Sequence, residues 1–217
     1  MKITIASTTC EFQSWWQKEG EWVEAPNVRR GGISGVQTLI TDQGLLYVKR
    51  QMGHVYRSIV RPWGEPTIMR EAHAYECFSK LGISVPHVQY VGARKVSGQW
   101  QALLVTQALK GFCDLDQWYS QNPSQAHRCA MLAKLAVLLK NMHQARWQHG
   151  CLYAKHIFVK SHGEDVEVAL LDLEKCKRRL LRKRASHNDF QQLKRHKGLM
   201  SDQDYHYLSA YYHTLSC

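Results

Sequence analysis

The sequence predicts an α+β fold of two lobes, a β-rich N-terminal lobe and a reduced, helical C-terminal lobe. Three observations support this prediction. Apolar runs typical of strands come mainly before residue 110, long stretches with helical spacing come mainly after it, and one short strand pair follows the longest helix. Segregated strands and helices are typical of α+β proteins, so we place the lobes at residues 1–109 and 110–217.

Strands and one helix are expected in the first lobe. The strands lie at 29–41 and 44–52, joined by a turn, with two more within 84–109. Residues 66–83 have helical spacing, and Gly82 ends the helix. We expect its apolar face to be buried through Ala72, Tyr75, Phe78 and Leu81. The aromatic N-terminal segment is expected to brace this lobe through Phe12, Trp15, Trp16 and Trp22.

Helices dominate the second lobe. They are expected at 113–121, at 123–145, which is the longest, at 188–196 and at 201–215. The loop "QHGCLYAKH" at 148–156 follows the longest helix and leads into short strands at 156–161 and 166–173. The second strand delivers Asp172 at its end, so a carboxylate follows a loop rich in His, Lys and Cys. This pairing indicates a site of chemistry.

Composition limits the classes of function. No apolar run approaches 18 residues, so no transmembrane helix is expected, and the N-terminus has no apolar segment of a secretory signal. Seven cysteines without a C-x-x-C pair favour reduced thiols in a cytoplasmic protein over a disulfide framework or a structural zinc site.

The charge is strongly positive and unevenly placed. The formal net charge is +11 at pH 7, and seven of the ten residues at 175–184 are basic. Such density is unusual for a merely solvated face, so we interpret it as an anion-binding surface. An anionic membrane surface or a phosphorylated ligand would fit it. Nucleic acid ranks below these, because no nucleic-acid-binding motif accompanies the charge.

Five features follow one another in an order that is more specific than any one of them. Gly32 and Gly35 lie near the start of a strand, where glycines let backbone N–H groups approach an anion. Lys49 lies inside an apolar strand and needs a partner for its charge, which Glu71 near the start of the helix can supply. The loop at 148–156 and the strand-end carboxylate complete the set. Taken singly, each feature has an ordinary structural explanation.

This order resembles the protein-kinase fold. The wider sequence, from about Phe12 to Tyr212, resembles the lipopolysaccharide-kinase (Kdo/WaaP) family through "PNVRRGGISGV", "LYVKR", "RPWGEPTIMRE", "ALLVT", "QHGCLYAKHIFVK" and "LDLEKCKRRL". The resemblance implies a two-lobed kinase-like fold that uses ATP and Mg²⁺. It also implies a bacterial protein that phosphorylates a heptose or Kdo sugar of the lipopolysaccharide core, on the cytoplasmic side of the inner membrane.

The resemblance assigns nucleotide-binding roles to the first lobe. The two glycines match the second and third glycines of a loop that covers the phosphates, while Arg30 takes the place of the first. Lys49 matches the lysine that holds the α- and β-phosphates, and Glu71 matches its partner. A hinge running to Leu109 would read adenine through backbone groups. The implied cofactor-binding residues are Gly32, Gly35, Lys49, Glu71, Thr106 and Gln107.

In the second lobe the resemblance assigns the catalytic loop and the metal site. His149 matches the first residue of H-R-D-x-x-x-x-N, Asp172 matches the aspartate that binds Mg²⁺, and Asp189 matches an aspartate that braces the loop. Two positions depart from the pattern. Cys151 replaces the catalytic Asp, and His156 replaces the final Asn, where a metal or phosphate contact is expected.

Cys151 decides whether the chain is an enzyme, and two interpretations stay open. It is either a small buried side chain without chemistry, or a thiol whose thiolate fraction is raised by Lys155, His149 or His156. Glu174 is another carboxylate near the site. The residues expected to take part in catalysis are Cys151, His149 and Lys155.

Two functions follow. The first is an ATP-dependent kinase whose acceptor is a lipopolysaccharide core sugar or a similar anion, with a peripheral contact to the anionic inner membrane through the basic run. The second is a pseudokinase that serves as a stress-responsive nucleotide-binding or regulatory module. Cys151 and Arg30 favour the second, and Lys49, Glu71 and Asp172 favour the first.

Overall fold

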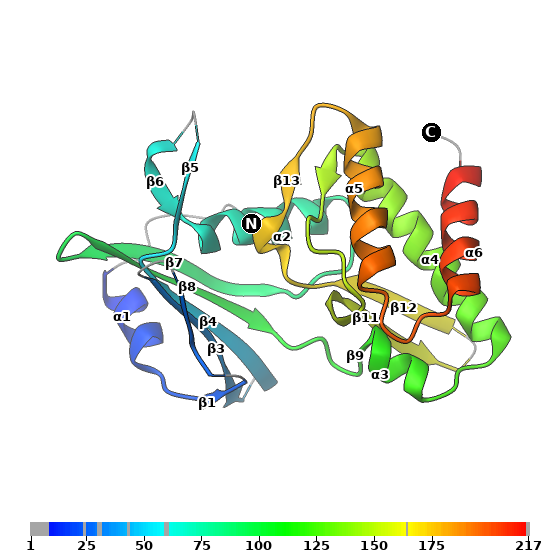
Figure 1. Ribbon diagram of the computed structural model, residues 1–217. Coiled ribbons are helices and arrows are strands. Elements are labelled where there is room, and N and C mark those ends of the chain that lie inside the picture. The colour runs from blue at the N-terminus through cyan, green and yellow to red at the C-terminus, as the bar shows by residue number, and fades with distance from the viewer. Residues whose placement is uncertain are drawn as a thin grey trace. The chain divides into compact units, whose positions relative to one another are not determined.

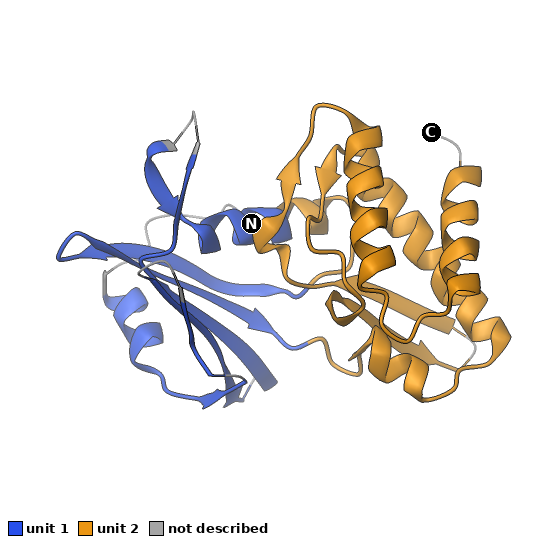
Figure 2. Cartoon of the chain, in the orientation of Figure 1, with its two compact units in different colours: residues 1–76, 86–108 blue, residues 77–85, 109–217 orange. Residues whose placement is uncertain are grey.

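The computed structural model describes residues 9–23, 25–29, 32–42, 44–58, 61–163 and 165–215. The chain forms two compact units (Figure 2). Unit 1 holds Met1–Glu76 and Pro86–Ala108, and unit 2 holds Cys77–Val85 and Leu109–Cys217. The predicted boundary between the lobes lay after residue 109. In the structure this boundary lies after Ala108, and Cys77–Val85 also belong to unit 2.

Unit 1 is built on an antiparallel sheet in the order β1-β3-β4-β8-β7, with β2 paired to β3 (Figure 1). Its strands are β1 Glu21–Trp22, β2 Asn27–Arg29, β3 Gly32–Thr41, β4 Gly44–Met52, β7 Val88–Val96 and β8 Gln99–Gln107. The two predicted hairpins are therefore confirmed. A further hairpin, β5 Val55–Ser58 with β6 Arg61–Pro66, was not predicted. Its short strands include Pro62, Gly64 and Pro66, which are poor strand signals.

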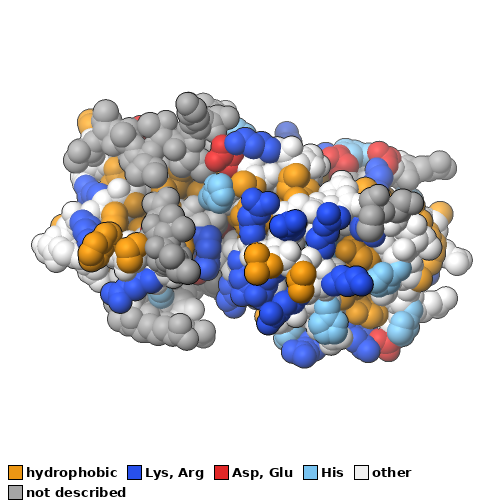
Figure 3. All heavy atoms as spheres, turned by 90° about the horizontal axis from the view of Figure 1, so that it is seen from above, with side chains coloured by type: hydrophobic (Ala, Val, Ile, Leu, Met, Phe, Trp, Pro, Cys, Tyr) orange, Lys and Arg blue, Asp and Glu red, His pale blue; other side chains and the backbone are white. Residues whose placement is uncertain are grey.

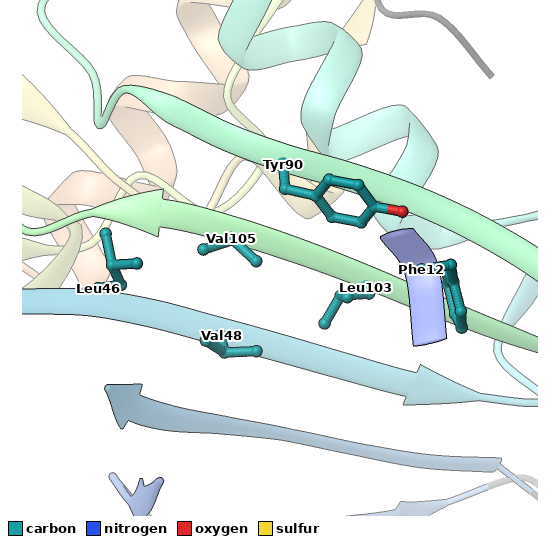
Figure 4. Close-up of a cluster of buried hydrophobic side chains, with 6 residues drawn as sticks. All are labelled: Phe12, Leu46, Val48, Tyr90, Leu103 and Val105. Carbon is teal, nitrogen blue, oxygen red and sulfur yellow. The ribbon is translucent and has the colours of Figure 1, made fainter. Parts of the chain in front are cut away.

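The core of unit 1 lies against one face of this sheet. Alternating residues of β4 and β8 form it together with aromatic rings, and the cluster comprises Phe12, Leu46, Val48, Tyr90, Leu103 and Val105 (Figure 4). Helix α1, Thr9–Gln17, contributes Phe12, while Trp15 and Trp16 pack against the cluster. The predicted aromatic brace is confirmed for these three residues. Trp22 is 49% exposed and belongs to β1 instead.

Helix α2, Thr67–Lys80, lies within the predicted range. Ala72, Tyr75 and Phe78 are buried, as their spacing predicts. Leu81 is exposed, which corrects the expected stripe, because the helix has ended before it and the chain turns at Gly82 with a φ of +70°.

Unit 2 is mainly helical. Its helices are α3 Leu115–Ser120, α4 Gln125–Gln144, α5 Arg182–Arg195 and α6 Asp202–Thr214, with short 3₁₀ turns η1 Ala154–His156 and η2 Leu173–Lys175. Side chains of Asp114, Ser124 and Ser201 cap three of these helices, which explains where they begin. Helix α5 begins six residues before the predicted 188, because the last part of the basic run is helical.

Small sheets position the loop that follows α4. The order β12-β11-β9 joins Asp165–Leu170, Ile157–His162 and Cys113–Asp114, and a separate pair joins β10 Trp147–Gln148 with β13 Lys177–Arg178. The buried face of α4, which includes Leu132, Leu135 and Leu139, supplies the core of this unit. Among the residues that the structure describes, no helix has the length and apolarity needed to span a bilayer.

Candidate active site

In unit 1, the strand lysine and the helix glutamate meet as an ion pair. Lys49 Nζ lies 2.7 Å from Glu71 Oε2, and both side chains are largely buried. Lys49 lies opposite Val36 of β3 and Leu104 of β8 in the centre of the sheet. Its side chain is 16% exposed. Glu71 lies in the second turn of α2 and does not open the helix. Burial strengthens the attraction between these charges, so the pair holds the lysine in one place.

The two glycines of the expected phosphate loop lie in β3, and both are required by packing. Gly32 pairs with Arg29 of β2, and a Cβ at Gly32 would lie 2.7 Å from the carbonyl oxygen of Met52. At Gly35 a Cβ would overlap the ring of Trp22. Glycine at these positions therefore has a structural reason that does not depend on a nucleotide. Arg30, at the place of the first glycine, falls outside the described residues.

The expected hinge residues end strand β8. Thr106 pairs with Tyr47 and Gln107 with Leu46. The N–H of Gln107 donates to the carbonyl of His87 at 2.9 Å, and the N–H of the next residue, Ala108, donates to Leu45 at 2.9 Å. Because these two donors are already used, an adenine ring would have to be read here by carbonyl oxygens or by N–H groups further along the chain.

In unit 2, the loop after α4 is held by Asp189 of helix α5. Asp189 is fully buried, and its carboxylate accepts the backbone N–H of His149 at 2.7 Å and that of Gly150 at 2.9 Å. His143 Nε2 lies 3.2 Å from the same carboxylate. Gly150 has a φ of +82°, and a Cβ there would lie 2.7 Å from the carbonyl oxygen of Lys175, so glycine is needed for this turn. Asp189 thus braces the loop as predicted.

His149 is a positioning residue in its present surroundings. Its Nδ1 accepts the N–H of Cys151 at 3.3 Å, so the ring proton lies on Nε2, which donates to the carbonyl of Leu171 at 3.0 Å. Burial lowers the pKa of His149, because the charged ring would lose its hydration. A neutral ring with both nitrogens engaged links the loop to the segment that carries Asp172.

Asp172 and His156 lie side by side. His156 Nδ1 donates to the carbonyl of Cys151 at 2.8 Å, which turns Nε2 toward Asp172 Oδ2 at 3.4 Å. Burial lowers the pKa of His156 and favours its neutral form. The unprotonated Nε2 of His156 and the carboxylate of Asp172 then face each other as two acceptors. A cation or a proton between these two groups removes the repulsion between them. Asp172 follows β12 by two residues and has a left-handed φ of +57°, so the carboxylate leaves the sheet at a sharp bend.

The carboxylate of Asp172 suits Mg²⁺, which is usually held by one or two carboxylates together with phosphate oxygens. Imidazole is the poorer ligand of the two for this ion. Across the described ranges, no three His, Cys, Asp or Glu side chains converge as a closed metal cage requires. Asp172 and His156 therefore fit a cation whose remaining ligands come from the phosphate groups bound with it.

Cys151 is buried, and sequence reasoning missed its neighbours. Lys175 lies close to its side chain, and Cys151 is the main reason that the pKa of Lys175 is raised. Tyr153 is also close to Cys151, and its own pKa is raised mainly by burial. Lys155, which was expected near the thiol, is exposed on η1. No signal in the sequence marked Lys175, because it is one of seven basic residues in its run.

Comparison with known proteins gives these observations a context. A sequence model described as "Lipopolysaccharide kinase (Kdo/WaaP) family" matches residues 13–212. Protein InaA of Escherichia coli (strain K12) is 42% identical over 217 residues, which cover 98% of this chain and 100% of that protein. A solved structure of WaaP in complex with acyl carrier protein has the same fold, with a TM-score of 0.70 at 17% identity, over 95% of this chain and 83% of that chain. The predicted kinase-like fold is confirmed, and the chain belongs to the lipopolysaccharide kinase (Kdo/WaaP) family.

Proposed function

We propose that the chain binds Mg-ATP and transfers the γ-phosphoryl group to a hydroxyl of a lipopolysaccharide core sugar, Kdo or heptose, or of a similar anionic acceptor. The Lys49–Glu71 pair carries this proposal. A buried ammonium group needs a counter-charge, which Glu71 supplies, and a lysine held in one place by a glutamate is suited to bind phosphate oxygens. We place the reaction in the cytoplasm, where ATP is available.

The residues divide the work between positioning and electrostatics. Lys49 binds the α- and β-phosphates, Asp172 holds the metal, and His156 lies beside it. When bound, Mg²⁺ neutralises charge on the phosphates of the nucleotide. Asp189 holds the loop through backbone N–H groups. These groups do most of what phosphoryl transfer requires, because its loose transition state depends chiefly on orientation and charge stabilisation.

A second function, that of a pseudokinase, is favoured by the contacts of Cys151. The acceptor hydroxyl must release its proton as its oxygen bonds to phosphorus, and a positioned base contributes about 10²–10⁴-fold to such a step. Cys151, at the position that the resemblance assigns to the base, is buried, and Lys175 and Tyr153 lie close enough to it that their pKa values are raised. In this alternative the chain binds nucleotide and acts as a stress-responsive regulatory module.

Nucleotide binding is tested by thermal unfolding with and without Mg-ATP. A ligand at about one hundred times its Kd stabilises a protein by about 2.7 kcal/mol, which gives a clear rise in Tm. Lys49→Ala and Asp172→Asn should abolish the rise, whereas the exposed matched controls Lys95→Ala and Asp165→Asn should keep it. A wild-type chain whose Tm does not change with Mg-ATP would rule out both functions.

The choice between kinase and pseudokinase is tested by transfer of label. The purified chain is incubated with γ-labelled ATP and lipopolysaccharide cores, and Cys151→Asp is compared with wild type. If the thiol merely slows a kinase, the aspartate variant should transfer label faster by up to the factor that a base contributes, about 10²–10⁴-fold. Transfer by neither protein, although both bind Mg-ATP, would favour the pseudokinase.

A further inference from the structure

Two leucines protrude from unit 2 in the middle of the basic run. Leu180 is 90% exposed and Leu181 is 67% exposed, in the connection between β13 and α5. This connection lies at the top of Figure 1, and the view from above in Figure 3 shows Lys and Arg side chains gathered around hydrophobic ones. Large apolar side chains exposed side by side are usually interaction sites, since water solvates them poorly.

The surroundings of the two leucines are cationic. Exposed basic residues flank them on both sides, namely Lys177, Arg178, Arg182, Lys183 and Arg184. No Asp or Glu occurs between Glu174 and Asp189 in the sequence. Helix α5 begins with three of these cations, has no acidic residue in its first turn, and its N-cap Leu181 makes no side-chain capping bond. Positive charge at the positive end of a helix is unfavourable, and a bound anion relieves it.

A cavity of about 600 Å³ lies beside this connection, between α4, α5 and α6. Arg182 and Lys183 line it, together with Lys140, whose ammonium lies 4.9 Å from the centre of the Tyr212 ring. None of the described residues lining it is acidic. Within the described part of the chain, neither Arg182 nor Lys183 forms a salt bridge. The cavity is therefore suited to a phosphate group, which arginine binds in bidentate fashion.

We propose that this connection and the cavity form a docking site for the anionic phospholipids of a membrane surface. Leu180 and Leu181 enter the boundary between headgroups and acyl chains, and Arg182, Lys183 and Lys140 bind a lipid phosphate. The combination of apolar tip and basic rim is what binding at a membrane interface requires, because neither part alone gives stable attachment. The alternative polyanion, RNA, offers nothing for the exposed leucines to contact.

The segment that carries Leu180 and Leu181 is fixed by hydrogen bonds to residues around the start of the loop at 148–156 and by helix α5. Strand β13 pairs with β10, so that Gln148 lies opposite Lys177. Arg179 donates from Nε to Gln148 Oε1 at 2.6 Å and from its backbone N–H to the carbonyl of Arg146 at 2.8 Å. On the other side, α5 carries Asp189, which holds the catalytic loop. A docked lipid would thus fix the loop relative to the membrane in which a lipid-linked acceptor sits, and this purpose rests on the proposed function.

The docking itself is measured without nucleotide or acceptor, so its outcome is separate from that of the kinase assays. The full chain is co-sedimented with vesicles of phosphatidylcholine, with and without phosphatidylglycerol. We expect binding only when phosphatidylglycerol is present. Leu180→Ser with Leu181→Ser should weaken it at least about tenfold, and Leu199→Ser, at an exposed leucine before α6, should leave it unchanged.

The charges are tested in the same assay. Arg182→Gln with Lys183→Gln removes two cations of the cavity, each worth about fivefold in partitioning, so the pair should cost about 25-fold. The matched pair Lys194→Gln with Arg195→Gln, exposed in the last turn of α5, should cost much less. Unfolding temperatures equal to that of the wild type show that each variant is folded.

Three results would overturn the proposal. The first is equal binding to both kinds of vesicle. The second is vesicle binding that the leucine pair does not affect and that both charge pairs weaken alike, which would indicate general attraction of a polycation. The third is tight binding of a single-stranded RNA probe by a chain that ignores vesicles, which would make the surface a nucleic-acid site.

Discussion

Asp189 accepts the backbone N–H of His149 at 2.7 Å. It also accepts the N–H of Gly150 and lies 3.2 Å from His143 Nε2, while His143 Nδ1 lies 3.0 Å from the hydroxyl of Tyr212. The shape of the loop at 148–156 is thus imposed on its backbone from helices α4, α5 and α6. Because these contacts do not involve the side chain of residue 151, the loop keeps its geometry with a thiol in place of a carboxylate.

We predict that Asp189→Asn lowers the free energy of unfolding by about 3 kcal/mol, because a buried acceptor of two N–H groups becomes a mixed donor and acceptor. Urea unfolding measures the change. Asp165→Asn is the matched control: this carboxylate pairs with Lys134 at an exposed position, so its loss should cost much less than the loss of Asp189. Equal effects at the two positions would contradict the bracing role.

Gly35→Ala tests whether packing against the Trp22 ring is the reason for glycine at this position. Gly35→Ala should lower stability by about 1 kcal/mol in the wild-type background, because the new methyl group overlaps the ring of Trp22. In a Trp22→Ala background the same change should be neutral or stabilising, since alanine is favoured over glycine in a strand. The measurement is a double-mutant cycle by urea unfolding. A cost that persists without the Trp22 ring would show that another contact requires the glycine.

The Lys49–Glu71 pair should show a coupling energy of about 1–3 kcal/mol in a double-mutant cycle of Lys49→Met and Glu71→Gln, because both side chains are largely buried and each single change leaves a charge there. Unfolding free energies of the four proteins measure it. The exposed pair Lys134–Asp165 serves as the reference and should give a much smaller coupling energy, because solvent screens both charges. A coupling no larger than the reference would mean that the pair is effectively solvated.

Stability should fall in mild acid. The pKa of His149 is lowered by burial, so as pH drops below its ordinary value of about 6.5 the unfolded chain takes up a proton that the folded chain refuses. The contribution is therefore complete above that pH and is lost progressively below it, with a slope of up to about 1.4 kcal/mol per pH unit.

His149→Gln should reduce this slope by up to about 1.4 kcal/mol per pH unit, which corresponds to one proton. Urea unfolding at a series of pH values measures the slope. The slope will not vanish, because the pKa of His156 is lowered in the same direction. An unchanged slope in His149→Gln would show that its ring is not buried in the neutral form.

Elements with a strong local pattern could be predicted from the sequence. Helix α4 differs from its predicted range by two residues at its start and one at its end, since a long apolar period and the cap at Ser124 are both local signals. The hairpin β5–β6 could not be predicted, because strands so short and rich in Pro and Gly have no local preference of their own.

The candidate site likewise has contacts that could be predicted from the sequence and one contact that could not. The pairing of Lys49 with Glu71 followed from the residue types and their order in the sequence, and the role of Asp189 followed from the family resemblance. The structure places these side chains as expected. The contact between Lys175 and Cys151 did not follow, because it depends on the bend at Asp172 and the close approach at Gly150. Both features are conformations of the backbone, and neither residue type demands them.

The contact between Tyr212 and His143 has a consequence for how the chain matures. The catalytic loop and helices α4 and α5 are complete by residue 195, but the hydroxyl that holds His143 arrives only with α6. During synthesis a ribosome releases the loop well before it releases this tyrosine. Until then His143 lacks its contact with the Tyr212 hydroxyl. The final turn of α6 therefore supplies the last of the contacts that hold the loop.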